Sequence, residues 1–124
     1  MIRIKRLAKS FVYAWRGLCK VFKEEQNLQI QTAGGLLIFI LAYFFQISRW
    51  EWIVLVLIVI LVILMELANS VVERITDALK PRISSYVKEI KDIMAAGVLV
   101  ASIAALIVGC IIFWPYLIKL FGQF

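Results

Sequence analysis

The sequence contains no histidine, so the side chain that most often serves as general base or metal ligand near neutral pH is absent. Any acid–base chemistry must therefore rest on carboxylates, lysine or tyrosine. Cysteine is also scarce, because Cys19 and Cys110 lie in different segments and form neither a CxxC pair nor a disulfide framework. We expect both cysteines to serve in packing.

Acidic residues are few. The chain has 8 of them and 14 lysines and arginines, which gives a net charge of +6. The basic residues adjoin apolar segments and form no nucleic-acid-binding motif, so we expect membrane headgroups rather than nucleic acid as their partners. Hydrophobic residues make up 64% of the chain. A soluble domain is closer to half apolar, so this excess requires lipid to cover it. We also expect no cleavable signal peptide, because residues 1–26 lack an uninterrupted apolar core.

Residues 2–24 have the pattern of an amphipathic helix. Apolar residues recur at steps of three and four, while seven lysines and arginines occupy the other faces. This pattern is typical of a helix that lies in the membrane interface with its basic side toward the headgroups. A soluble core helix is the alternative, but little other soluble chain exists for it to pack on.

Three long apolar stretches follow, at residues 32–47, 52–68 and 94–121. Each is long enough, with its flanking residues, to form a membrane-spanning helix. We therefore predict an all-α integral membrane protein with a single domain over residues 1–124. Residues 1–26 form the interfacial helix, and residues 28–47, 52–77 and 90–121 form the membrane helices.

The distribution of lysine and arginine predicts the orientation. Seven lie in the first 23 residues and five lie between Arg74 and Lys91, whereas only Arg49 and Lys119 lie at the opposite ends of the spans. The positive-inside rule places the N-terminus and the 78–91 loop of this multi-pass membrane protein in the cytoplasm. Trp50 and Trp52 then fall where an aromatic belt is expected.

A polar stripe continues the second apolar stretch without a break. At about 100° per residue, one helix face carries five polar residues, namely Glu66, Asn69, Ser70, Glu73 and Asp77. Carboxylates in or near hydrocarbon are costly and usually face a polar interior. Glu66 lies past the bilayer midplane toward the cytoplasm, so the stripe suits chemistry between a lipid headgroup and a cytosolic cosubstrate. A carboxylate placed there can act as a general base.

Two further groups of charged residues can reach the level of this stripe. Glu24 and Glu25 end the interfacial helix, and Lys91 and Asp92 open the last helix of the predicted set. The helix dipole explains Asp92 but disfavours Lys91, whose charge a bound phosphate would compensate.

Residues 66–77 follow the pattern E-x-x-N-S-x-x-E-x-x-x-D, which resembles the signature of the prokaryotic diacylglycerol kinases. The similarity extends to Lys91 and Asp92 with the A-A-G-V-L-V run that follows them at residues 95–100, and to residues 13–18 and 25–31. It covers nearly the whole chain in the same order, with the same interfacial helix and three spans.

The resemblance implies a homotrimer of three-span protomers with active sites shared between neighbouring chains. It implies transfer of the γ-phosphoryl group from ATP, with Mg²⁺, to a lipid hydroxyl. It makes Glu66 the catalytic base, and Glu25 and Glu73 the residues that hold the metal beside the nucleotide. The other positions that it assigns to the nucleotide or the site are Arg6, Tyr13, Asn69, Arg82, Ile83, Ser84, Lys91 and Asp92.

The residue types suit this chemistry, because phosphoryl transfer depends on charge neutralisation and alignment. Neither a Walker A loop nor a protein-kinase signature is present. The sequence departs from the family in its 78–91 loop, which lacks a histidine that some members carry, so the adenine contacts stay open. Gln31 stands where other members have glutamate or histidine, so its role stays open. The role of Asp77 stays open as well.

The family divides between kinases of diacylglycerol and kinases of undecaprenol. The pattern around Glu25 and Asn27, and the ending at residues 111–115, resemble the second group more closely. We expect undecaprenol as the acceptor, with diacylglycerol as the alternative. A non-enzymatic membrane scaffold would not explain five polar residues in one stripe. A small transporter would require one carboxylate at the midplane and would have no need for Lys91.

Overall fold

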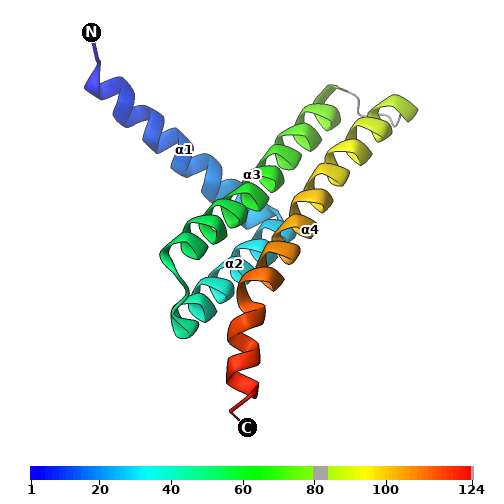
Figure 1. Ribbon diagram of the computed structural model, residues 1–124. Helices are drawn as coiled ribbons and strands as arrows, with labels where there is room; N and C mark the ends of the chain where they lie inside the picture. The colour runs from blue at the N-terminus through cyan, green and yellow to red at the C-terminus, as the bar shows by residue number, and fades with distance from the viewer. Residues whose placement is uncertain (80–83, 124) are drawn as a thin grey trace.

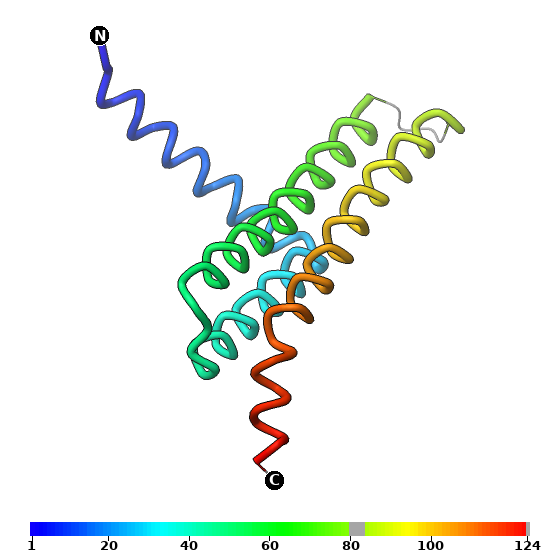
Figure 2. Tube along the Cα trace, viewed as in Figure 1, coloured from blue at the N-terminus to red at the C-terminus, as the bar shows by residue number. Residues whose placement is uncertain are grey.

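The computed structural model describes residues 1–79 and 84–123, which contain four helices and no strand. The helices are α1 (Ile4–Glu24), α2 (Gln26–Phe45), α3 (Arg49–Leu79) and α4 (Ser85–Phe121). Helices α2, α3 and α4 lie side by side, and α1 projects away from them at an angle (Figures 1 and 2). The predicted all-α class is confirmed.

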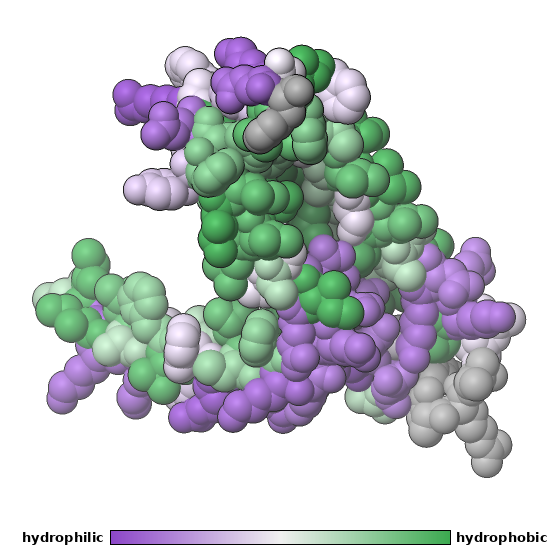
Figure 3. Space-filling model, turned by 90° about the horizontal axis from the view of Figure 1, so that it is seen from below, coloured by the Kyte–Doolittle hydropathy of each residue, from purple (hydrophilic) through white to green (hydrophobic). Residues whose placement is uncertain are grey.

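Helices α2, α3 and α4 are each long and apolar enough to cross a membrane. In the most apolar 18-residue segment of each helix, at most 22% of the residues are buried inside the chain. Most of this apolar surface therefore faces outward. Figure 3 shows the apolar block between hydrophilic ends, with hydrophilic side chains of the N-terminal helix along one edge. Lipid is the medium that such a surface requires, which supports the prediction of three membrane-spanning helices.

The turn between α2 and α3 combines two capping motifs. Gln46 takes a left-handed conformation with φ of 53°, its N–H donates to the Tyr43 carbonyl, and the Ile47 N–H donates to the Ala42 carbonyl. These are the two hydrogen bonds of a Schellman motif. Ser48 then starts α3 with a capping box, because its Oγ accepts from the Glu51 N–H while Glu51 Oε1 accepts from the Ser48 N–H.

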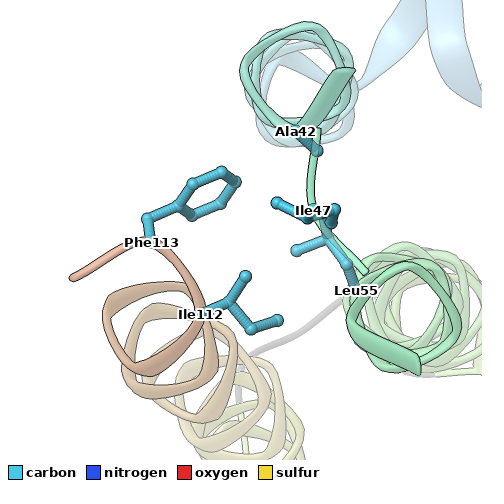
Figure 4. Close-up of a cluster of buried hydrophobic side chains, with 5 residues drawn as sticks. All are labelled: Ala42, Ile47, Leu55, Ile112 and Phe113. Atoms are coloured by element: carbon cyan, nitrogen blue, oxygen red, sulfur yellow. The ribbon is translucent and has the colours of Figure 1, made fainter. Parts of the chain in front are cut away.

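The buried apolar core lies next to this turn, at the end of the helix bundle far from the polar stripe. Five side chains point toward one another there (Figure 4), and they are Ala42, Ile47, Leu55, Ile112 and Phe113. Tyr116, one residue after Pro115 in α4, donates a hydrogen bond of 2.6 Å to Glu51 Oε1. This bond ties the last part of α4 to the start of α3, beyond the point where proline interrupts the helix ladder.

Helix α4 begins earlier than residue 90, where the sequence pattern placed its start. Ser84 caps the helix, since its Oγ accepts a hydrogen bond of 3.2 Å from the Val87 N–H. The first residues of α4 after Ser85 mix polar and apolar side chains, and the continuous apolar run that predicts a membrane helix begins only later in the sequence. Lys91 and Asp92 are therefore in the second turn, where the dipole argument for Asp92 no longer applies.

Replacing Gln46 with glycine should stabilise the fold. A side chain in the left-handed conformation costs about 1–2 kcal/mol, and glycine avoids this cost at an entropic penalty of about 0.5–1 kcal/mol. We expect Gln46→Gly to raise the free energy of unfolding in mixed micelles by up to about 1 kcal/mol. Gln46→Ala is the matched control and should give no gain in stability, because alanine keeps the strain of the left-handed conformation. A Gln46→Gly protein that is less stable than the wild type would contradict the left-handed conformation of residue 46.

Candidate active site

The polar stripe on α3 passes from a buried position to an exposed one along an unbroken helix. Glu66 is 7% exposed and Ser70 is 2% exposed, Asn69 and Glu73 are half-buried, and Asp77 is exposed. The helix therefore carries its polar side chains out of the packed bundle toward the end that bears the basic residues. This arrangement matches the stripe that the helical period predicted.

A cavity of about 430 Å³ opens beside the buried end of the stripe. Three helices line it, with polar groups on α2 and α3 and mainly small or apolar groups on α4. Its lining residues are Asn27, Ile30, Gln31, Glu66, Asn69, Ala95, Val98, Leu99 and Ser102. Glu66 is thus buried from the surrounding medium while it faces a cavity large enough for a small polar group.

Two further carboxylates lie near Glu66, although neither of them lines this cavity. The charges of Glu25, at the junction of α1 and α2, and of Glu73 on α3 lie close enough to interact electrostatically with the Glu66 carboxylate. Asn69 Nδ2 donates a hydrogen bond of 3.3 Å to Glu73 Oε1, which orients that side chain. The helix period brings Glu66, Asn69 and Glu73 together, and the α1–α2 corner adds Glu25.

The chemistry of this set fits a magnesium ion. Mg²⁺ prefers oxygen ligands and is commonly bound by one or two carboxylates together with substrate phosphates and waters. Glu25 and Glu73 supply two such carboxylates. Among residues 1–79 and 84–123, no group of three or more acidic, cysteine or histidine side chains is arranged to hold a metal ion by itself.

Lys91 lies beside the exposed end of the stripe. Its Nζ forms an ion pair of 2.5 Å with Asp77 Oδ1, which joins α4 to α3. Asp77, whose role the sequence left open, is therefore the counter-ion of Lys91 in this structure. Asp92 follows on α4 with an exposed side chain.

Several residues that the sequence assigned to the site lie elsewhere in this chain or outside the described residues. Arg6 and Tyr13 are exposed on α1, whose N-terminal part extends away from the other helices (Figure 1). Ser84 acts as the cap of α4. Arg82 and Ile83 lie outside the described residues.

Sequence reasoning missed the polar contact that bridges α2 and α4. Gln31 Nε2 donates a hydrogen bond of 3.4 Å to Ser102 Oγ, and both residues line the cavity beside Glu66. The same two residues also line a second groove of about 260 Å³ that continues into the apolar part of the bundle. The available signal was a pair of polar side chains within otherwise apolar helices, because such groups in a membrane helix usually face a partner.

The chain is similar in sequence to known proteins over most of its length. A family model described as prokaryotic diacylglycerol kinase matches residues 12–113. The undecaprenol kinase of Bacillus subtilis is 30% identical over 114 residues, covering 92% of this chain and 93% of that protein. The diacylglycerol kinase of Escherichia coli K12 is 28% identical over 111 residues, covering 90% and 91%. The diacylglycerol kinase of a Synechocystis strain is 34% identical over 115 residues, covering 92% and 66%.

The Asp77–Lys91 pair should contribute little to stability, because 68% of the Asp77 side chain and 36% of the Lys91 side chain are exposed. Exposed ion pairs contribute about 0.2–1 kcal/mol. We expect Asp77→Asn and Lys91→Gln each to lower the free energy of unfolding by less than about 1 kcal/mol, measured by denaturant titration in micelles. A loss of several kcal/mol from either variant would show that the pair is a main structural contact.

Proposed function

Because the chain belongs to the prokaryotic diacylglycerol kinase family, we propose that this lipid kinase transfers the γ-phosphoryl group of ATP, with Mg²⁺, to the hydroxyl of undecaprenol. The observation that carries the proposal is the cavity beside Glu66, which is lined by both polar and apolar groups and continues into an apolar groove. A lipid can place its hydroxyl in such a cavity while its chain stays among apolar side chains.

In this proposal Glu66 is the general base. Its buried carboxylate accepts the proton of the lipid hydroxyl as the hydroxyl oxygen attacks the γ-phosphorus. The bond from the γ-phosphorus to the bridging oxygen breaks, ADP leaves, and a lipid phosphate monoester forms. Burial among α2, α3 and α4 limits the access of water, which would otherwise compete with the lipid hydroxyl for the phosphoryl group.

The remaining residues orient the nucleotide and its metal. Glu25 and Glu73 hold Mg²⁺, and Asn69 keeps the Glu73 carboxylate in place through its hydrogen bond. When bound, the ion neutralises charge on the phosphate oxygens. Lys91 and Asp92 serve the nucleotide, and Lys91 exchanges its partner Asp77 for a phosphate oxygen when the nucleotide binds.

We further propose a homotrimer in the cytoplasmic membrane, with the N-terminus and the active site on the cytoplasmic side. In such a trimer the three apolar helices of each copy would lie beside those of its neighbours within lipid. Arg6 and Tyr13 would then complete the site of a neighbouring protomer, since they belong to α1, which projects away from the other three helices (Figure 1). Arg82, Ile83 and Ser84, which lie between α3 and α4 in the sequence, would serve the nucleotide on the cytoplasmic side.

The choice of acceptor rests on the undecaprenol kinase relative and on Asn27, which belongs to the sequence pattern that resembles undecaprenol kinases and also lines the cavity. Diacylglycerol is the alternative, because two of the relatives described above are diacylglycerol kinases. Both lipids present a single primary hydroxyl at the membrane surface, so the same base and the same metal would serve either of them.

The catalytic role of Glu66 can be tested by transfer of label from γ-labelled ATP in micelles that contain undecaprenol or diacylglycerol. We expect Glu66→Gln to lower turnover by about 10²- to 10⁴-fold, the range for loss of a general base, while nucleotide binding persists. The matched control is Glu89→Gln, which changes an exposed carboxylate on α4 and should keep full activity. Full activity of Glu66→Gln would refute its role, and label in neither lipid with the folded wild type would refute the kinase assignment.

The metal role predicts a separate effect on magnesium dependence. Glu25→Ala and Glu73→Ala each remove one oxygen ligand, so we expect the Mg²⁺ concentration for half-maximal activity to rise by about 10-fold or more. Glu89→Ala removes a carboxylate of the same type and should leave this concentration unchanged. An unaltered Mg²⁺ dependence in both site variants would contradict the assignment.

A further inference from the structure

The proposed metal carboxylate Glu25 occupies the corner between two helices. Its backbone is extended, with φ of −106° and ψ of 107°, and the residue serves at once as the C-cap of α1 and the N-cap of α2. The direction of its side chain therefore depends on how α1 meets α2. Glu73, by contrast, belongs to the regular helix α3 and is oriented by Asn69.

Local hydrogen bonds fix the corner only with respect to α1 and α2. The Glu25 N–H donates to the Val21 carbonyl at 2.8 Å, and Gln29 Nε2 donates to the Phe22 carbonyl at 2.8 Å. Both bonds satisfy carbonyl groups at the end of α1, which a helix end would otherwise leave without partners. Neither of them reaches α3, which carries Glu66 and Glu73.

Arg74 connects this corner to α3. One of its terminal nitrogens lies 2.6 Å from Glu24 Oε2 and 4.0 Å from Glu25 Oε1. Arg74 directly follows Glu73, so one short segment of α3 both carries a proposed metal ligand and binds the corner that carries the other.

We propose that Arg74 is a positioning residue, which sets Glu25 opposite Glu73 by binding Glu24 at the α1–α2 corner. The proposal rests on the proposed function, in which Glu25 and Glu73 hold the metal. Arg74 itself does not contact the metal or the reacting atoms. Its effect runs through the direction in which the corner points the Glu25 carboxylate.

The electrostatic effect of Arg74 and its proposed positioning effect predict opposite changes in metal binding when Arg74 is removed. A positive charge 4.0 Å from Glu25 repels a divalent cation, so its removal would strengthen metal binding if charge alone mattered. Loss of the link to α3 would instead weaken binding, because two carboxylates that are no longer held together bind a shared ion less well. Arg74→Gln therefore separates the two explanations by the sign of its effect.

The test measures Mn²⁺ binding by electron paramagnetic resonance, with a non-hydrolysable ATP analogue and the full chain folded in micelles. We expect Arg74→Gln and Glu24→Gln to weaken Mn²⁺ binding by about two- to five-fold, the range for loss of an exposed ion pair. Arg74→Lys keeps the charge and part of the link and should restore most of the affinity. Lys23→Gln is the matched control, since it removes an exposed positive charge from the same end of α1 without changing this pair.

Unchanged or tighter Mn²⁺ binding in Arg74→Gln would overturn the positioning role. Glu24→Gln provides a second variant if Arg74→Gln does not fold, and unchanged binding in this variant would likewise overturn the role. Glu25→Gln separates this outcome from failure of the proposed function. If Glu25→Gln lowers Mn²⁺ binding while the Arg74 and Glu24 variants do not, only the positioning role fails; if Glu25→Gln has no effect, the metal site itself is wrong.

Discussion

A buried carboxylate directly after the long apolar run of α3 is the constraint on which the site depends. Hydrocarbon offers no hydrogen bonds to Glu66, so the chain must cover this group with its own helices and give it a polar cavity. Helices α2 and α4 do so, and they leave Glu66 only 7% exposed beside Asn27, Gln31 and Ser102. The cavity is therefore a consequence of packing three apolar helices around one polar stripe.

One end of the helix bundle holds the contacts that fix how the helices pack, and the other end holds the proposed metal and nucleotide site. The apolar core, the Schellman turn at Gln46 and the bond from Tyr116 to Glu51 lie at one end, where they fix how α2, α3 and α4 meet. The ionic contacts of Arg74 and Lys91 lie at the other end and are partly exposed. Rearrangement is thus easiest where the proposed nucleotide and metal bind, because exposed ion pairs cost little to exchange.

Much of this architecture follows from the sequence, since apolar length and helical period predicted the three long helices and the stripe from Glu66 to Asp77. Contacts between distant segments could not be predicted in this way. The pair of Arg74 with Glu24 and the bond of Gln31 to Ser102 depend on how helices pack, which periodicity does not specify. The early start of α4 was missed because a cap at Ser84 is a weaker signal than an apolar run. The residue roles came from the family resemblance and stay predictions.

The most direct test is a structure of the protein in lipid with Mn²⁺, a non-hydrolysable ATP analogue and undecaprenol, in which the anomalous scattering of manganese locates the metal. We predict the manganese peak between Glu25 and Glu73, with the lipid hydroxyl beside the Glu66 carboxylate in the cavity. A manganese site away from both carboxylates, or a lipid hydroxyl bound elsewhere with Glu66 facing only protein, would contradict the proposed site.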